Sequence, residues 1–375
     1  MDASFFGGKL GATLTYSNTV TKDQILNVPL PAFTGYLHQW RNAGTLSSNT
    51  YEASIDGRLY QSRDMRWSAR VIFSKTKSTI TKLTEPAFQY GVNGQGLGTV
   101  FYAREGEQMG TFYGLKYASS CGDLPEGVSC DGFKVNSDGY LVWVGSNSDN
   151  TWGTPSSDEG ITIRGSPVMW GTPFAGQCTD KSTGEPTQFC PLGKTMPDYT
   201  AGLSSTFTWK NLTIYGLLDA VQGFNVYNQP LQWGVFKGWA GLFDQSAVPG
   251  ATPTNANNGY NGAKPLGYVN ALYSVSGLNP SSVFVEDGSF VKLREVSLSY
   301  RLTPEQLSGV PGLNRFSSIG ITLTGNNLIT WTKYRGFDPE VGKSGGDVGS
   351  AVLARVEGYQ YPQFRTWTAA IELNF

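Results

Sequence analysis

The chain has 375 residues, of which 15% are charged and 13% are aromatic, and it contains 47 Gly. Its formal net charge of -1 and pI near 6.0 give no case for binding nucleic acid or an anionic membrane surface. The mean hydropathy is -0.25, and no apolar run approaches the ~18 residues that a membrane helix needs. The apolar residues must therefore lie in alternating patterns. A secreted β-solenoid or sandwich would share this profile.

Alternation of apolar and polar residues begins near the N-terminus and recurs before residue 75. Apolar side chains occupy every second position of 6–16, 51–59 and 67–73. Because successive side chains of a strand point to opposite faces, each segment predicts a strand with one apolar and one polar face. The short stretch from Gln61 to Arg66 predicts a tight connection between the second and third of these strands.

The segment 119–199 is rich in Gly, Ser, Asp and Pro, and we expect it to contain one or more further strands. It holds the four cysteines, Cys121, Cys130, Cys178 and Cys190. Neither neighbouring pair has the C-x-x-C spacing of a zinc or redox site. We therefore expect two disulfides, each closing a small local loop, and these imply an oxidising compartment. Three connectivities are possible, and free thiols in flexible loops are the alternative.

The pattern between residues 203 and 323 predicts five more elements, four strands and one helix. Alternating segments at 203–209 and 212–218 flank Lys210-Asn211, which predicts a tight turn. In 290–300 the apolar phase slips near Arg294-Glu295, as a β-bulge would make it. The only helix candidate is Pro304–Ser308, which follows the N-cap-like Thr303, and another strand is predicted around 319–323.

The last ten residues alternate throughout. One face carries Trp367, Ala369, Ile371, Leu373 and Phe375. Trp367 and Phe375 lie about 26 Å apart along a strand at roughly 3.3 Å per residue. A tilt of about 40° projects this to roughly 20 Å, close to the apolar band of an outer-membrane barrel. The pattern predicts a barrel-closing strand whose apolar face meets lipid, whereas in a soluble sandwich it would be an edge needing protection.

The predicted connections differ strongly in length. Segments 119–199, 223–288 and 333–363 are long, whereas 61–66 and 210–211 are short. Outer-membrane barrels have short periplasmic turns and long external loops. If the final strand ends on the periplasmic side, counting back makes 333–363 and 223–288 external and makes 303–315 and 210–211 periplasmic. Every connection after residue 200 fits this rule.

No pattern indicates catalysis, a metal or a cofactor. The single histidine, His38, has no partner at ligand spacing, and no nucleophile elbow, P-loop, zinc-protease or dinucleotide motif occurs. The glycine-rich 91–98 precedes no helix that could bind phosphate. The carboxylates Asp338 and Glu340 could serve as acid and base, but ordering of a loop is the favoured interpretation. We expect no enzymatic activity.

Five tryptophans in the long connections are candidates for contacting a substrate or partner: Trp143, Trp152, Trp170, Trp233 and Trp239. Exposed aromatic rings stack on sugar rings, on peptide side chains or on another protein. The alternative is that they pack the loops against one another.

Several blocks also carry a family resemblance. The most specific are Phe290-Val-Lys-Leu-Arg-Glu-Val-Ser-Leu-Ser-Tyr300, Leu323-Thr-Gly-Asn-Asn-Leu328, Thr332-Lys-Tyr-Arg-Gly-Phe-Asp-Pro-Glu340 and Tyr361-Pro-Gln-Phe-Arg-Thr366. Segments 6–10, 22–31 and 197–203 match in order upstream. Together they resemble the SusC/RagA family of TonB-dependent outer-membrane transporters from Bacteroidota-like bacteria. One block departs, because Tyr51 stands where the family usually has Gly.

The resemblance implies an all-β fold, the C-terminal part of an antiparallel transmembrane β-barrel with long extracellular loops. Such transporters have about 22 strands around a plugged lumen, and residues 1–375 would supply about ten to twelve of them. The N-terminal plug domain and early strands would be absent from the chain. The implied location is the outer membrane of a Gram-negative, Bacteroidota-like cell.

The implied partners are a SusD-like surface lipoprotein over the external loops, TonB acting through the missing plug, the missing N-terminal half of the barrel, and outer-membrane lipid. The predicted function is active transport of a large nutrient, either an oligosaccharide or a peptide. A structural or scaffolding barrel subunit of an envelope assembly and a passive pore are the alternatives.

Overall fold

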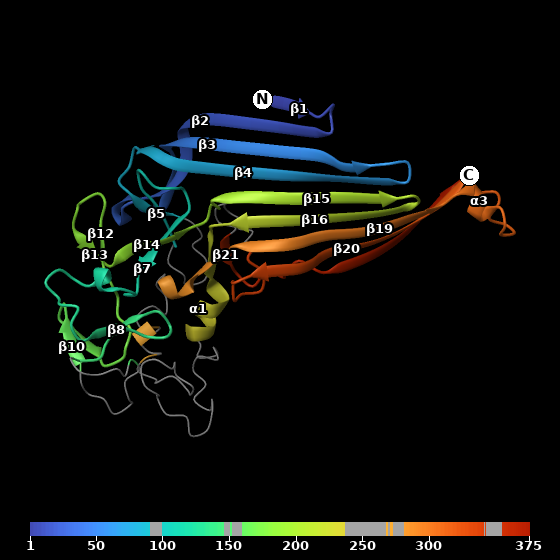
Figure 1. The fold of residues 1–375 in the computed structure, drawn as a ribbon. Coiled ribbons are helices and arrows are strands. Elements are labelled where there is room, and N and C mark those ends of the chain that lie inside the picture. The colour runs from blue at the N-terminus through green and yellow to red at the C-terminus, as the bar shows by residue number, and fades with distance from the viewer. Residues whose placement is uncertain are drawn as a thin grey trace, which may run out of the picture.

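A nine-stranded antiparallel sheet dominates the fold (Figure 1). The computed structural model describes residues 1–90, 100–145, 151, 160–236, 268, 271–272, 281–340, 342 and 355–375. The sheet strands, in spatial order, are β1 (Asp2–Phe5), β2 (Leu10–Pro29), β3 (His38–Gln61), β4 (Met65–Leu83), β15 (Tyr199–Trp209), β16 (Leu212–Gln222), β19 (Phe290–Leu302), β20 (Ser318–Thr332) and β22 (Thr366–Asn374). This confirms an antiparallel β fold. The main sheet has nine strands, with β1 and β22 at its edges, so the expected number of about ten to twelve barrel strands is not confirmed.

The remaining elements lie in the long connections. A four-stranded sheet contains β5 (Phe88–Tyr90), β6 (Phe101–Ala103), β7 (Thr111–Leu115) and β14 (Phe189–Lys194), and a three-stranded one contains β17 (Asn225–Asn228), β18 (Val285–Asp287) and β21 (Val356–Glu357). Three hairpins join β8 (Phe133–Val135) to β9 (Leu141–Trp143), β10 (Gly160–Ile163) to β11 (Ser166–Met169), and β12 (Cys178–Thr179) to β13 (Pro186–Thr187). Segment 119–199 does therefore contain strands.

Helices are short throughout the described residues. These are α1 (Gln229–Phe236), α3 (Pro304–Leu307) and the 3-10 turns η1 (Ala32–Thr34), η2 (Cys121–Asp123) and η4 (Ser282–Phe284). In the described part of the chain, none of the helices has the length and apolar character needed to cross a membrane.

The main sheet has one apolar and one polar face because its register keeps the alternation of every strand in phase. One cross-strand row joins Ile55, Val71, Leu203 and Leu218, and all four side chains lie on the apolar face. On the opposite face, hydroxyl pairs bridge neighbouring strands, as between Ser299 and Thr322 at 2.9 Å. A slip of one residue would move each set to the other face, so the pattern specifies the register.

Two sequence-based predictions in this sheet are confirmed in detail. The registers of β19 with both neighbours shift between Leu293 and Glu295, which makes Arg294 the bulged residue. The turn between β15 and β16 places Lys210 at a φ of 51°. Outside the sheet, helix α3 begins after Thr303, as predicted, and the structure adds a capping box between Thr303 and Gln306.

The prediction of a single helix is wrong, because α1 lies within the segment interpreted as a long loop. Its N-terminus is capped by Asn228, whose Oδ1 accepts a hydrogen bond from the Leu231 backbone N–H at 2.9 Å. Asn228 followed by Pro230 is the sequence signal that could have predicted this helix.

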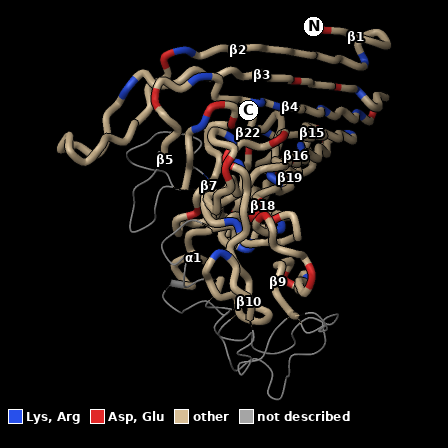
Figure 2. Tube along the Cα trace, turned by 90° about the vertical axis from the view of Figure 1, so that its left-hand side faces the viewer, with Lys and Arg blue, Asp and Glu red and all other residues tan. Residues whose placement is uncertain are grey.

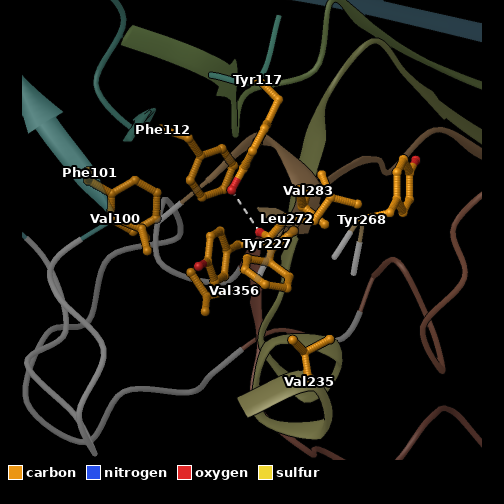
Figure 3. Packing of buried hydrophobic residues seen from close by; sticks show 11 residues of the cluster. Val100, Phe101, Phe112, Tyr117, Tyr227, Val235, Tyr268, Leu272, Val283 and Val356 are labelled. Atoms are coloured by element: carbon orange, nitrogen blue, oxygen red, sulfur yellow. Dashed lines mark hydrogen bonds between the residues drawn. The ribbon is translucent and has the colours of Figure 1, made fainter. Parts of the chain in front are cut away.

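The long connections all leave the same end of the sheet, and their described parts, here called the loop body, pack together beside it (Figures 1 and 2). Its main hydrophobic cluster includes Phe112, Tyr227, Phe284 and Val356, which come from three different connections (Figure 3). The Tyr117 hydroxyl donates a hydrogen bond to the Leu272 carbonyl at 2.8 Å. The loops thus share one core and form a folded unit.

Candidate functional site

The polar face of the sheet is hollowed in two places. One pocket is lined by polar residues of five strands, among them Thr15, Glu52, Ser74, Thr200 and Asp219, together with apolar residues such as Ile72. The other is lined by charges of both signs, including Lys9, Asp56, Arg58 and Arg70. The polar side chains offer hydrogen-bond donors and acceptors to a solute, and the first pocket adds apolar contacts from Ile72 and Phe73.

A buried ion network joins this polar face to the loop body. Lys292 of β19 is 2% exposed, and its Nζ lies 2.8 and 2.9 Å from the two Asp338 carboxylate oxygens. The same Nζ donates to Glu340 Oε2 at 2.8 Å. Because an isolated charge is costly to bury, Lys292 depends on these two loop carboxylates.

Arg294 extends the network along the sheet. Its guanidinium donates to Asp219 Oδ2 of β16 at 2.6 Å and to both Glu340 oxygens at 2.7 Å. Arg294 is the bulged residue, and a bulge re-aims the side chain that it carries. The bulge thereby brings a strand cation to the same carboxylate that Lys292 binds.

The network also sets the ionisation of Glu340. Burial opposes its charged form, but hydrogen bonds from Arg294 and Lys292 lower the pKa of this carboxyl to about 2. A second acid nearby shows the opposite behaviour, because burial raises the pKa of Glu357, which accepts a hydrogen bond from the Tyr334 hydroxyl.

Asp338 and Glu340 were the carboxylates considered from the sequence, and the structure places both against cations rather than facing an open site. The residues that sequence reasoning missed are Lys292, Arg294 and Asp219. The signal was present as Lys-x-Arg on a strand and Asp-x-Glu in a connection, but their pairing spans more than 40 residues of sequence.

The tryptophan candidates are only partly brought together. Trp143 and Trp170 pack edge to face with ring centroids 5.9 Å apart, and both are half-buried, which favours a role in packing the loops. Trp233 is half-buried on α1. Trp152 and Trp239 lie outside the described residues.

The other candidates occupy clear positions. Cys121 pairs with Cys130, and Cys178 pairs with Cys190, in two local disulfides. Trp367, Ile371 and Leu373 are exposed on the edge strand β22, with Ile371 at 70%, and Phe375 is exposed directly after this strand. His38 is exposed at the start of β3, and the described residues contain no cluster of three or more His, Cys, Asp or Glu side chains that could hold a metal ion.

Replacing Lys292 by Met should destabilise the attachment of the loop body by about 3–5 kcal/mol, because Asp338 would be left buried without its cation. Thermal or denaturant unfolding of the detergent-solubilised protein measures this loss. Lys333→Met is the matched control, since Lys333 is exposed and its loss should change stability by less than about 0.5 kcal/mol. Equal stability of the two variants would contradict the role of the network.

Acid should weaken the same network. The pKa of Glu340 is lowered in the folded protein, so its stabilising contribution is complete above the ordinary value near 4.5 and is lost as the pH falls toward about 2. Unfolding curves recorded between pH 6 and 3 should therefore show a falling midpoint. The pKa of Asp123 is also lowered to about 2, so this carboxyl contributes to the same loss of stability in acid. The unaltered protein is therefore compared with Glu340→Gln, in which the unfolding midpoint should still fall with pH, but less steeply. An unchanged slope in that variant would refute the assignment.

Comparison with known proteins gives a consistent answer. No family model matches the chain. Three curated proteins of Formosa agariphila do: TonB-dependent receptor P3 at 27% identity, P26 at 26% and P39 at 22%, over 100%, 100% and 92% of this chain. The chain spans about one third of their length. These relatives are receptors, in agreement with the expectation that the chain is not an enzyme.

Solved structures agree in fold. The RagAB peptide transporter matches with a TM-score of 0.63 at 20% identity, and the RagAB peptide importer in its closed-closed state matches with 0.60 at 20% identity. Each match covers 100% of this chain and 34% of the other. Over its whole length the chain thus resembles about one third of a TonB-dependent receptor and shares that part of the fold with the RagAB transporter.

Proposed function

We propose that residues 1–375 form the C-terminal barrel portion of an outer-membrane transporter that actively imports a large nutrient, an oligosaccharide or a peptide. The observation that carries this proposal is the apolar face of the main sheet, which is exposed along its length and bounded at both ends by aromatic side chains.

One aromatic row lies toward the loop body and the other toward the short turns. The first contains Tyr16 and Tyr51, whose rings are 5.0 Å apart, with Phe73 and Tyr199 at 5.6 Å. The second contains the exposed side chains Tyr60, Trp67, Trp209 and Tyr300. Aromatic side chains with one polar end favour the boundary between lipid and water, so two such rows are what a membrane-spanning sheet requires.

The spacing of the rows supports a membrane span. On β3, Tyr51 and Tyr60 are separated by about 30 Å at roughly 3.3 Å per residue. A strand tilt of about 40° projects this to about 23 Å, near the apolar height of about 25 Å in outer-membrane barrels. Between the rows the outward side chains are apolar, as in Ile55, Val71 and Leu203.

In this arrangement the loop body is extracellular and the short turns face the periplasm. The connections at 62–64, 210–211 and 303–317 lie at one end of the sheet, and the three long ones lie at the other. The edges β1 and β22 would pair with strands of the missing N-terminal half of the barrel, because lipid does not tolerate unpaired strand edges.

The transport mechanism follows from the expected partners. TonB would supply energy through a plug domain, a SusD-like surface lipoprotein would cover the loop body, and outer-membrane lipid would surround the apolar face. The polar face, with its paired hydroxyls and charges, would line the passage. The names of the relatives and the peptide import by RagAB support an importing role.

Lipid contact predicts that charge is tolerated on one face only. Leu203→Arg should reduce stability by about 2–4 kcal/mol in the membrane, because Leu203 lies on the apolar face near the middle of the band. Thr206→Arg, three residues along the same strand on the polar face, is the control and should fold normally. The readout is the folded fraction in vesicles at increasing urea concentration. Equal tolerance of both substitutions would argue against a membrane span.

Transport is tested with the complete polypeptide that contains this chain. Cells lacking it should lose uptake of either labelled oligopeptides or labelled oligosaccharides, and deletion of TonB should abolish the same uptake. Uptake that persists without TonB would indicate a passive pore. No loss of uptake in either arm, together with a defect in envelope integrity, would indicate a scaffolding barrel and overturn the proposal.

A further inference from the structure

The segment 178–190, here called the stapled hairpin, is closed by the Cys178–Cys190 disulfide. Within it, β12 and β13 pair only through Cys178 with Thr187 and Thr179 with Pro186. The intervening turn is held by the Asp180 carboxylate, which accepts a hydrogen bond from the Ser182 backbone N–H at 2.8 Å. Two backbone hydrogen bonds extend the hairpin, from the Asp180 N–H to the Glu185 carbonyl and from the Gly184 N–H to the Asp180 carbonyl, both at 2.8 Å. The disulfide fixes this short hairpin to Cys190 of β14, which pairs with β7.

The stapled hairpin supplies the counter-ions of two buried charges. The Arg104 guanidinium donates to Asp180 Oδ1 at 3.3 Å and to Oδ2 at 3.0 Å. Glu107 Oε1 accepts hydrogen bonds from Lys181 Nζ at 3.2 Å and from the Tyr113 hydroxyl at 2.7 Å. Arg104 and Glu107 are 8% and 7% exposed, so neither can exchange its partner for bulk water without moving.

Both charges belong to the turn between β6 and β7, and that turn is attached to the main sheet. The Ile80 backbone N–H of β4 donates to the Glu107 carbonyl at 2.8 Å, and the Gly106 N–H donates to the Ile80 carbonyl at 2.8 Å. The Leu83 N–H donates to Glu105 Oε1 at 2.6 Å. Turn 104–107 therefore connects the loop body to strand β4 of the main sheet.

We propose that the Cys178–Cys190 disulfide is a redox-sensitive clamp that holds turn 104–107 on β4. With the disulfide formed, Asp180 and Lys181 are held where they neutralise Arg104 and Glu107. With the disulfide broken, the hairpin regains conformational freedom and the two charges lose their fixed partners. The turn then leaves β4 to regain water, which loosens this attachment of the loop body.

The chemistry requires only a dithiol reductant. One thiolate of the reductant attacks a sulfur of the disulfide and the second completes the exchange, so that the S–S bond breaks, two S–H bonds form and the reductant is oxidised to its own disulfide. Cys190 is fully buried, whereas Cys178 is half-buried and is the sulfur that a reductant would reach.

The other disulfide provides a matched control. Cys121–Cys130 also closes a short loop, and its Asp123 carboxylate binds Lys116 and the backbone of Ser119 and Ser120. Among the hydrogen bonds of the described residues, those of 121–130 reach Gln177 but neither turn 104–107 nor β4. Its loss should disturb the loop body locally and leave the attachment to β4 intact.

Hydrogen exchange of the full polypeptide in detergent tests the clamp. In Cys178→Ala/Cys190→Ala the amides of Ile80, Leu83 and Gly106 should exchange at least tenfold faster than in the unaltered protein, and in Cys121→Ala/Cys130→Ala they should not change. Treating the folded Cys121→Ala/Cys130→Ala protein with dithiothreitol should reproduce the acceleration, which separates loss of the clamp from a failure to fold. Asp180→Asn, which keeps the disulfide, should accelerate Gly106 as well.

The proposal is overturned if these amides stay protected after reduction, or if they respond equally to loss of either disulfide. It is independent of the transport proposal, because exchange at β4 is measured without any substrate, TonB or lipoprotein.

Discussion

Two-sided alternation is the constraint on which the rest of the structure depends. Apolar residues such as Ile55, Val71 and Leu203 form an exposed row on one face of the sheet, and hydroxyls and charges form rows on the other. A sheet of this kind is stable only where its faces meet two different environments, and a shift of one residue would exchange them. Register, strand order and the ends of the apolar band are therefore coupled. In a membrane the aromatic rows would lie at the boundary between lipid and water.

The loop body is joined to this sheet at two separate places. At the first, Lys292 and Arg294 bind the carboxylates of the connection after β20. At the second, turn 104–107 is hydrogen-bonded to β4, and its buried charges Arg104 and Glu107 are paired with the stapled hairpin. Desolvation of such pairs offsets much of their attraction, so they add less stability than an apolar contact of the same size. Their value lies in geometry, because a buried charge has few acceptable partners and so specifies where a loop must sit. The apolar cluster around Tyr227 then supplies the cohesion of the loops themselves.

Local signals correctly predicted several elements that depend on neighbouring residues. The phase slip predicted the bulge at Arg294, and Thr303 predicted the cap of α3. Alternation predicted the final strand, and the structure shows that this strand pairs with β20. Helix α1 was missed because its apolar residues follow no clear period, and only Asn228 and Pro230 mark its start. The partners of Asp338 and Glu340 could not be predicted, since they lie more than 40 residues away and pairing at that distance leaves no periodic trace. The tryptophans illustrate the same limit, because composition placed Trp143 and Trp170 in the loops but did not show that they pack together.

The sequence by itself determined the two faces, the alternation of short and long connections and the resemblance to TonB-dependent transporters, because each is carried by residues close together in the chain. Only the tertiary structure decided which connections share a core, which cations bind the loop carboxylates and which disulfide-closed loop contacts the turn that is attached to β4. Those contacts join residues brought together by the sheet, and their energies depend on burial and distance, which arise only when the strands have paired.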